Sequence, residues 1–277
     1  MYTIKDDKII ITDLTQFHPM HILECGQIFR YTKSQDDYIV YSKDQKAKII
    51  RQNNNYIIEC TDLDYFIKFF DLDTDYSIIK STLTQNPLME KAIEFGYGIR
   101  ILNNNLLEMI ISFIISANNN IPRIQKSIEY ICNNLGDKKG DYYTFPNIES
   151  LHKADEEFFK KAGTGYRAKY LVDTIDKIYS NTFDLNFLAN LDTNEARKYL
   201  LQLLGIGEKV ADCILLFGLH RMDVFPVDTW IHKIYNESIS KTPLNNRKHI
   251  TRELVSKFQD LSGYAQQYLF YYRRSGI

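Results

Sequence analysis

The stretch that decides the fold reads LGIGEKVADC and spans residues 204–213. Before it, Asp192 and Glu195 have the spacing of a helix-start capping box, and the apolar residues that follow keep a helical period. Gly205 and Gly207 then interrupt the pattern, and a second helical pattern begins at once. Glycine adopts backbone angles closed to other residues and lets another chain approach closely. The pattern therefore predicts two helices joined by a tight hairpin.

The start of the second helix is a candidate phosphate site. Its first backbone N–H groups lack partners within the helix, and the helix dipole favours an anion there. Gly205 and Gly207 would leave this end accessible to a DNA backbone, with no need for side-chain charge. A simple corner between two helices explains the same glycines, so the hairpin alone does not define a function.

Lys209 lies in the first turn of the second helix, where the positive end of the helix dipole makes a cation unfavourable. The same field favours a neutral amine, which is the form that a nucleophilic lysine needs. For Lys209 taken alone, the alternative is an exposed side chain that points away or touches phosphate.

Asp228 gives Lys209 a candidate partner. A helix over residues 209–219 is roughly 16 Å long at about 1.5 Å per residue. The seven residues 221–227 can span roughly 23 Å, so the chain can return Asp228 to the end where Lys209 lies. An amine beside a carboxylate suits attack at a sugar carbon that gains positive charge. Because Asp228 precedes an expected helix at 229–235, the structural alternative is a helix N-cap.

The rest of the chain predicts an α+β protein with two domains. Residues 8–12, 38–41, 47–51 and 56–60 alternate as the strands of an antiparallel meander, and helices are expected at 62–70 and 86–97. From about residue 100 the pattern is helical, at 105–117, 121–135, 150–162 and 168–179. The expected domains are an N-terminal antiparallel sheet domain with helices at 1–98 and an all-α domain with the helix–hairpin–helix at 99–277.

Composition limits the classes of function. The 277 residues are 44% hydrophobic and 25% charged. The net charge of −1 argues weakly against a nucleic-acid binder, but it still allows one basic face. The four cysteines are too far apart for a zinc or iron–sulfur motif, so neither a metal nor a cofactor is expected. No apolar stretch is long enough to span a membrane. We expect an intracellular monomer with reduced thiols.

The hairpin, followed by VFPVD at residues 224–228, resembles the helix–hairpin–helix/Gly-Pro-Asp glycosylase superfamily, and within it the 8-oxoguanine DNA glycosylase family. Four further stretches match in the family's order. They are CGQIFR at 25–30, SANNNIPR at 116–123, GYRA at 165–168, and Ala265 and Gln266 with Phe270. The resemblance therefore covers most of the chain.

The resemblance implies a DNA N-glycosylase and abasic-site lyase that acts on double-stranded DNA containing oxidised guanine. Lys209 would attack C1′ of a flipped 8-oxoguanine nucleotide paired with cytosine, expel the base and form a Schiff base that permits β-elimination. Asp228 would support the developing sugar cation and assist proton transfers. The carbonyl of Gly26 would accept the N7–H that guanine lacks, since guanine N7 is itself an acceptor.

The resemblance also implies further contacts. Gln266 would recognise the Watson–Crick edge of the flipped base, and Cys213 and Phe270 would sandwich its ring. Around the gap, the implied residues are Asn118, Arg123 and Arg167 for the orphaned cytosine and Tyr166 as the wedge. Each has an ordinary structural alternative, such as a strand bend, a helix cap or a core aromatic.

The sequence departs from the family pattern at one position, and three other classes of protein fit it less well. Trp230 stands where the family often has a histidine, with His232 two positions further, so contacts near the flipped nucleotide's phosphate can differ. No cysteine follows Cys213, which excludes relatives that carry an iron–sulfur cluster after the Asp. Alkylbase glycosylases generally lack the lysine, and a non-catalytic hairpin module gives no reason for Lys209 together with Asp228.

Overall fold

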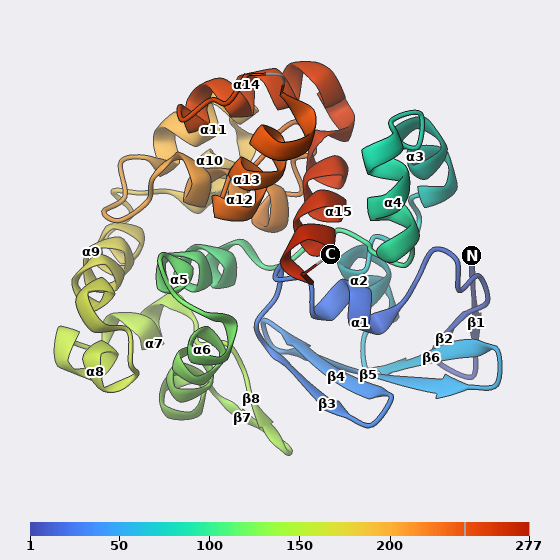
Figure 1. The fold of residues 1–277 in the computed structure, drawn as a ribbon. Coiled ribbons are helices and arrows are strands. Elements are labelled where there is room, and N and C mark those ends of the chain that lie inside the picture. The colour runs from blue at the N-terminus through green and yellow to red at the C-terminus, as the bar shows by residue number, and fades with distance from the viewer. Residues whose placement is uncertain (241, 277) are drawn as a thin grey trace.

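A six-stranded antiparallel sheet is joined to a large group of helices in the computed structural model, which describes residues 1–240 and 242–276 (Figure 1). The strands of this sheet are β1 (Tyr2–Lys5), β2 (Lys8–Ile11), β3 (Tyr31–Ser34), β4 (Asp37–Ser42), β5 (Gln45–Gln52) and β6 (Asn55–Cys60). Their spatial order is β1-β2-β6-β5-β4-β3. The predicted strands are all present, but β2 pairs with β6, so the meander covers only β3 to β6. The edge strands β1 and β3 were not predicted, because their residues are mostly exposed and do not alternate.

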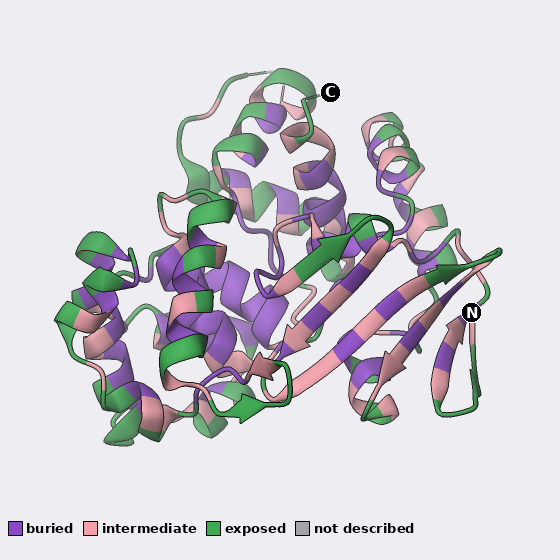
Figure 2. Cartoon of the chain, turned by 90° about the horizontal axis from the view of Figure 1, so that it is seen from below, coloured by how far each residue is buried: buried purple, intermediate pink, exposed green. Residues whose placement is uncertain are grey.

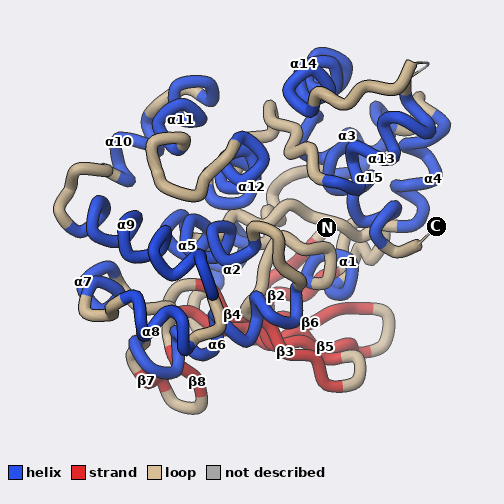
Figure 3. Tube along the Cα trace, turned by 60° about the vertical axis from the view of Figure 1, so that its left-hand side comes forward, coloured by secondary structure: helices blue, strands red, loops and turns tan. Residues whose placement is uncertain are grey.

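The sheet buries one face against helices α1 (Pro19–Leu23) and α2 (Leu63–Phe69). Buried and partly buried residues alternate along β4 and β6, as Figure 2 shows, because successive side chains of a strand point to opposite faces. Val40 and Ile58 contribute to this core from the strands, and Phe66 and Phe69 from α2. In Figure 3 the strands gather on one side of the molecule and the helices occupy the rest.

The remaining helices begin and end as follows. They are α3 (Tyr76–Leu83), α4 (Pro87–Phe95), α5 (Leu106–Ser116), α6 (Ile121–Leu135), α7 (Ile148–His152), α8 (Glu156–Lys161), α9 (Ala168–Tyr179), α10 (Leu185–Asn190), α11 (Thr193–Leu200), α12 (Glu208–Gly218), α13 (Thr229–Ile234), α14 (Arg247–Phe258) and α15 (Ser262–Arg274). Short turns of helix lie at Gly165–Arg167, Tyr235–Ile239 and Gln259–Leu261, and a small hairpin pairs β7 (Lys138–Lys139) with β8 (Tyr142–Tyr143).

The prediction of one continuous helix at 150–162 is wrong. The chain forms α7 and α8 instead, because the Asp155 carboxylate accepts the N–H of Phe158 at 2.8 Å and starts a new helix. Helices α1 and α3 were not predicted. Met109 to Ile115 of α5 are all buried, which places this helix inside the helical domain.

The described residues form two hydrophobic cores. Besides the sheet core, a larger one is centred on α5 and α12, which pack directly against each other. Helices α3 and α4 precede residue 98, yet Ile79 and Ile93 belong to this larger core. The domain boundary itself stays a prediction.

Two buried arginines hold the sheet domain together and against the helices. Arg100 is fully buried, and its guanidinium donates to the carbonyls of Phe70, Gln16 and Thr74. Arg30 lies 3.6 Å from the carboxylate of Glu108 on α5, with side chains 7% and 2% exposed. Glu108 also accepts the backbone N–H of Lys43 at 2.9 Å, so this carboxylate holds the sheet against α5.

We predict that Glu108→Leu lowers the free energy of unfolding by about 3–5 kcal/mol, because it leaves the buried Arg30 charge without its carboxylate. Urea denaturation measures the loss. The control is Glu156→Gln, which breaks the exposed pair with Lys160 on α8 and changes the same quantity by about 0.5 kcal/mol or less. Equal losses in the two variants would contradict the prediction.

Candidate active site

The predicted hairpin joins α11 to α12. Asp192 caps α11 by accepting the N–H of Glu195 at 2.8 Å. Gly205 has φ of +84°, and a Cβ there would lie 2.4 Å from the ring of Tyr170, so both the turn and the close packing require glycine. A Cβ on Gly207 would meet nothing within 4 Å. The N-terminus of α12 is therefore open to an approaching group.

Only the first turn of α12 is near the surface, because Val210 to Gly218 are all buried. Within this buried stretch Asp212 accepts a hydrogen bond from Nε of Arg197 at 2.6 Å. Burial raises the pKa of Asp212, and the Arg197 charge opposes that rise. The ion pair connects the two helices of the hairpin and fixes the direction in which α12 begins.

A cavity of about 740 Å³ opens beside the first turn of α12. Seven of the residues singled out from the sequence line it, namely Gly26, Asn118, Lys209, Cys213, Asp228, Gln266 and Phe270. They come from the sheet domain, from the turn after α5, and from α12, α13 and α15. The fold therefore brings together residues that lie far apart in sequence.

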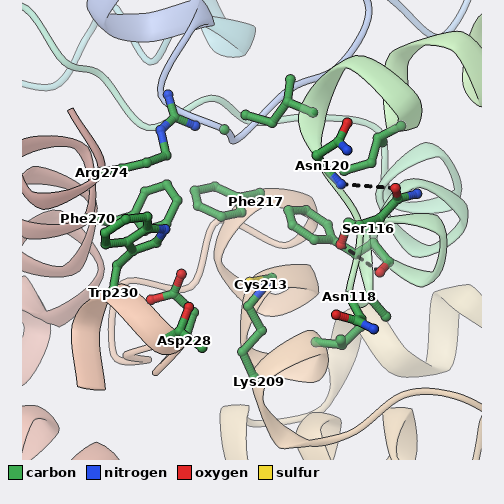
Figure 4. A pocket seen from close by; sticks show the side chains of 18 of the residues that line it. Ser116, Asn118, Asn120, Lys209, Cys213, Phe217, Asp228, Trp230, Phe270 and Arg274 are labelled. Atoms are coloured by element: carbon green, nitrogen blue, oxygen red, sulfur yellow. Dashed lines mark hydrogen bonds between the residues drawn. The ribbon is translucent and has the colours of Figure 1, made fainter. Parts of the chain in front are cut away.

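Two helical rows form much of the cavity wall. Side chains four residues apart lie on the same face of a helix. The rows are Lys209, Cys213 and Phe217 on α12, and Gln266, Phe270 and Arg274 on α15. Figure 4 labels all of these except Gln266. Sequence reasoning missed Phe217 and Arg274, although continuing each row by one turn would have found them. It also gave no role to Phe29, Phe113 and Arg247, which carry no local signal.

The side chain of Lys209 extends from the start of α12 toward Cys213 (Figure 4). Its Nζ lies 5.8 Å from the ring centroid of Phe113 on α5. Burial raises the pKa of Cys213 to about 11, and the adjacent Lys209 opposes that rise. The Cys213 thiol is therefore protonated at neutral pH and does not compete as a nucleophile.

Asp228 is both a helix cap and a wall of the cavity. Its carboxylate accepts the N–H of Ile231 at 2.8 Å, as the N-cap of α13. Burial raises the pKa of Asp228, and the Ile231 hydrogen bond and the charge of Lys209 oppose that rise. The two interpretations of Asp228 that the sequence left open are therefore compatible.

The loop that carries Gly26 is fixed by α15. Arg274 donates to the carbonyl of Glu24, and Nε2 of Gln267 donates to the carbonyl of Cys25 at 2.9 Å. Among the described residues no N–H or O–H donates to the next carbonyl, that of Gly26. Gly26 has φ of +87°, and a Cβ on it would lie 3.3 Å from the Phe270 ring. The site therefore requires a glycine and leaves its carbonyl available.

Two further polar atoms at the cavity lack partners. Oε1 of Gln266 and Nη1 of Arg274 are buried and make no hydrogen bond within residues 1–240 and 242–276. Buried polar atoms are normally paired, and exceptions are common where a ligand binds. Two cavity-lining residues on the same row of α15 thus each keep one unpaired polar atom, an acceptor in Gln266 and a donor in Arg274.

Three predicted contacts with the opposite strand lie outside the cavity lining. Tyr166 is 53% exposed, and Arg123 is exposed on α6. Arg167 is buried and donates from Nε to the carbonyl of Ala117 at 2.7 Å and from Nη2 to that of Asn118 at 2.8 Å. Arg167 therefore supports the turn that follows α5, and the roles of these residues toward DNA stay predictions.

Family models match almost the whole described chain. The N-terminal domain of 8-oxoguanine DNA glycosylase matches residues 9–110, and the HhH-GPD superfamily of base excision DNA repair proteins matches residues 111–260. The N-glycosylase/DNA lyase OGG1 of Arabidopsis thaliana is 35% identical over 62% of this chain, which spans about half (51%) of that protein. A probable N-glycosylase/DNA lyase of Methanothermobacter thermautotrophicus is 30% identical over 84% of this chain and 78% of its own.

Solved structures agree with the family models. The 8-oxoguanine glycosylase/lyase of Clostridium acetobutylicum, in complex with double-stranded DNA containing cytosine opposite 8-oxoguanine, has a TM-score of 0.93 and 38% identity. The similarity covers 99% of this chain and 98% of that one. A 3-methyladenine DNA glycosylase from Archaeoglobus fulgidus shares the fold at 17% identity and a TM-score of 0.75.

The sheet domain, the hairpin and the cavity with its amine and carboxylate define the class of protein, a helix–hairpin–helix base excision glycosylase. Within that class, the chain belongs to the 8-oxoguanine DNA glycosylase family, and the curated relatives that it matches over most of its length include N-glycosylase/DNA lyases. The family resemblance, the α+β fold and the class of enzyme predicted from the sequence are confirmed. No helix of the described residues has the length and hydropathy needed to cross a bilayer.

Proposed function

We propose that this protein excises 8-oxoguanine paired with cytosine from double-stranded DNA and then cleaves the strand at the abasic site. The observation that carries the proposal is the placement of Lys209 and Asp228, from two separate segments, on one cavity. An amine and a carboxylate there match the needs of a displacement at a sugar carbon with cationic character.

The reaction proceeds in two stages. The neutral amine of Lys209 forms a bond to C1′ as the C1′–N9 bond breaks, and the bonding pair leaves with the base, which takes up a proton. After the amine loses its proton, the C1′–O4′ bond opens to give a Schiff base. Removal of a proton from C2′ then expels the 3′ phosphate, and water hydrolyses the imine to restore Lys209. The Asp228 carboxylate stabilises the sugar cation electrostatically.

Selection of 8-oxoguanine rests on the loop before β3. The Gly26 carbonyl, which no described donor occupies, would accept the N7–H of 8-oxoguanine, whereas the N7 lone pair of guanine would be repelled. The unpaired Oε1 of Gln266 fits an N–H of the Watson–Crick edge. Phe270 and Cys213, on facing rows, would hold the ring between them.

Binding of the duplex fits the surface around the cavity. The open N-terminus of α12 at Gly207 would take a DNA phosphate through backbone N–H groups. The exposed ring of Tyr166 would fill the space left by the flipped nucleotide, and Asn118 with Arg123 and Arg167 would contact the orphaned cytosine. In the C. acetobutylicum relative the bound duplex carries cytosine opposite 8-oxoguanine.

A Schiff base at Lys209 can be trapped chemically. Borohydride is expected to trap a covalent complex between the protein and a duplex that holds 8-oxoguanine opposite cytosine, because the Schiff base is reduced to a stable amine. Lys209→Gln should lose the complex, whereas Lys198→Gln, on the exposed side of α11, should retain it. Gel electrophoresis measures the trapped fraction. A complex that persists in Lys209→Gln would sink the assignment.

Protonation of Asp228 should limit the reaction at low pH. Burial raises the pKa of Asp228 above the 3.8 usual for aspartate, so kcat/KM for base release should fall as the pH drops through a midpoint above 3.8. Protonation removes the charge that supports the sugar cation. Asp228→Asn keeps an N-cap for α13 but should lower the plateau by about 100-fold to 1000-fold and abolish this acid limb. An unchanged limb in Asp228→Asn would contradict the role.

Arg123 and Arg167 should differ in what their loss does to stability. Both alanine variants should lose the preference for cytosine when base release is measured opposite each of the four bases. Arg123→Ala should change the free energy of unfolding by about 0.5 kcal/mol or less, because Arg123 is exposed. Arg167→Ala should lower it by about 1.5–3 kcal/mol, because carbonyls of the turn lose a charged donor. An undiminished cytosine preference in Arg123→Ala would refute its contact.

A further inference from the structure

We propose that Arg274 is a base-contacting residue whose unpaired guanidinium N–H donates to an oxo group flanking N7 of the flipped base, and that this contact assists departure of the base. The inference rests on the proposed function and adds a residue to its base pocket. Neither the hairpin nor the Lys209–Asp228 pair requires it.

The position of Arg274 follows from the helical row on α15. Gln266, Phe270 and Arg274 are spaced four residues apart, and all three line the cavity. If the base ring lies against Phe270, Gln266 is one turn before the ring and Arg274 one turn after it. The base would then meet an acceptor toward one edge and a cationic donor toward the other.

The Arg274 guanidinium is held by a hydrogen bond from one of its nitrogens, while another has no partner. One nitrogen, Nη2, donates to the carbonyl of Glu24, while Nη1 is buried and without a partner among the described residues. The Cζ atom lies 5.4 Å from the ring centroid of Phe270. Nη1 lies 3.1 Å from the position that a Cβ on Gly26 would occupy. The unused N–H group therefore sits where Gly26 and Phe270 meet.

The chemistry of the base supplies an acceptor at this place. With N7–H directed at the Gly26 carbonyl, the oxo groups O8 and O6 lie on either side of N7. An arginine nitrogen beside Gly26 would meet one of them in a charge-assisted hydrogen bond. When the C1′–N9 bond breaks, its electron pair passes to the base, and part of the negative charge develops on these oxygens. A fixed cation there favours the departing base more than the bound one.

Arg274 also has a structural explanation. A cation suits the C-terminus of α15, and the bond to Glu24 helps to hold the Gly26 loop. This explanation accounts only for Nη2, which donates to the Glu24 carbonyl. The neighbouring carbonyl of Cys25 does not need Nη1, because Gln267 already donates to it. The structural explanation does not say why Nη1 is buried without a hydrogen-bond partner among the described residues. The two explanations differ in what the substitution of Arg274 does to bases that carry different oxo groups.

The first measurement compares two rates in Arg274→Met. We expect single-turnover release of 8-oxoguanine to fall about tenfold to a hundredfold relative to cleavage of a duplex with a preformed abasic site, because the abasic substrate has no base to contact. Borohydride trapping on the abasic duplex reports that the variant is folded and that the amine chemistry is intact. Loss of trapping in the wild-type protein would instead overturn the proposed function.

The matched control is Arg273→Met. Arg273 is the adjacent cation on α15, it pairs with Glu237, and it does not line the cavity. Its substitution removes the same charge from the same helix end and should leave the ratio of the two rates within about twofold of wild type. An equal fall in the ratio for Arg273→Met and Arg274→Met would show a general effect of charge and would overturn the proposal.

The second measurement identifies the oxo group. In a Lys209→Gln background, Arg274→Met is tested for its effect on the Kd of duplexes with 8-oxoguanine, 8-oxoadenine or guanine at one position. Contact with O6 weakens 8-oxoguanine more than 8-oxoadenine, which has no O6. Contact with O8 weakens 8-oxoguanine and 8-oxoadenine more than guanine. Equal weakening of all three, or none for 8-oxoguanine, would mean that Arg274 only holds Glu24 and would overturn the proposal.

Discussion

Burial of α12 against α5 is the constraint on which the site depends. From Val210 onward α12 is buried among other elements, so beyond its first turn it meets a ligand only along the row that lines the cavity. Lys209 occupies that turn and lies over Phe113 of α5. The same packing directs Cys213 and Phe217, each one turn further along, to the cavity. A change that rotated α12 would therefore displace the amine, the thiol and the aromatic ring together.

The cavity joins both domains, and buried hydrogen bonds hold it there. The carbonyls of Glu24 and Cys25 both accept hydrogen bonds from α15. The next carbonyl, that of Gly26, accepts none from the described residues. Across the cavity, Arg167 performs a similar task for the carbonyls that follow α5. Because an unpaired buried group is costly, these bonds fix the loops before any ligand arrives. Preorganisation of this kind is what electrostatic stabilisation of a transition state requires.

Asp228 is at once the N-cap of α13 and part of the cavity wall. As an N-cap it must stand at the end of α13 with its carboxylate turned toward backbone N–H groups. That same end of α13 lies on the cavity that holds Lys209. Burial raises the pKa of the carboxyl, and the cap hydrogen bond works in the opposite direction. The cap therefore helps to keep the carboxylate ionised in a partly buried place.

The sequence by itself determined the local structure and the candidates for chemistry. The glycines of the hairpin, the caps at Asp192 and Asp228, and the periods of α5, α6 and α9 depend on neighbouring residues, so they were visible in the chain. Only the tertiary structure decided that β2 pairs with β6, that Arg167 holds carbonyls, and that Phe29 and Phe113 reach the cavity. These facts depend on contacts between residues far apart in the chain. Such contacts leave no local pattern, because the packing of whole helices and strands fixes them.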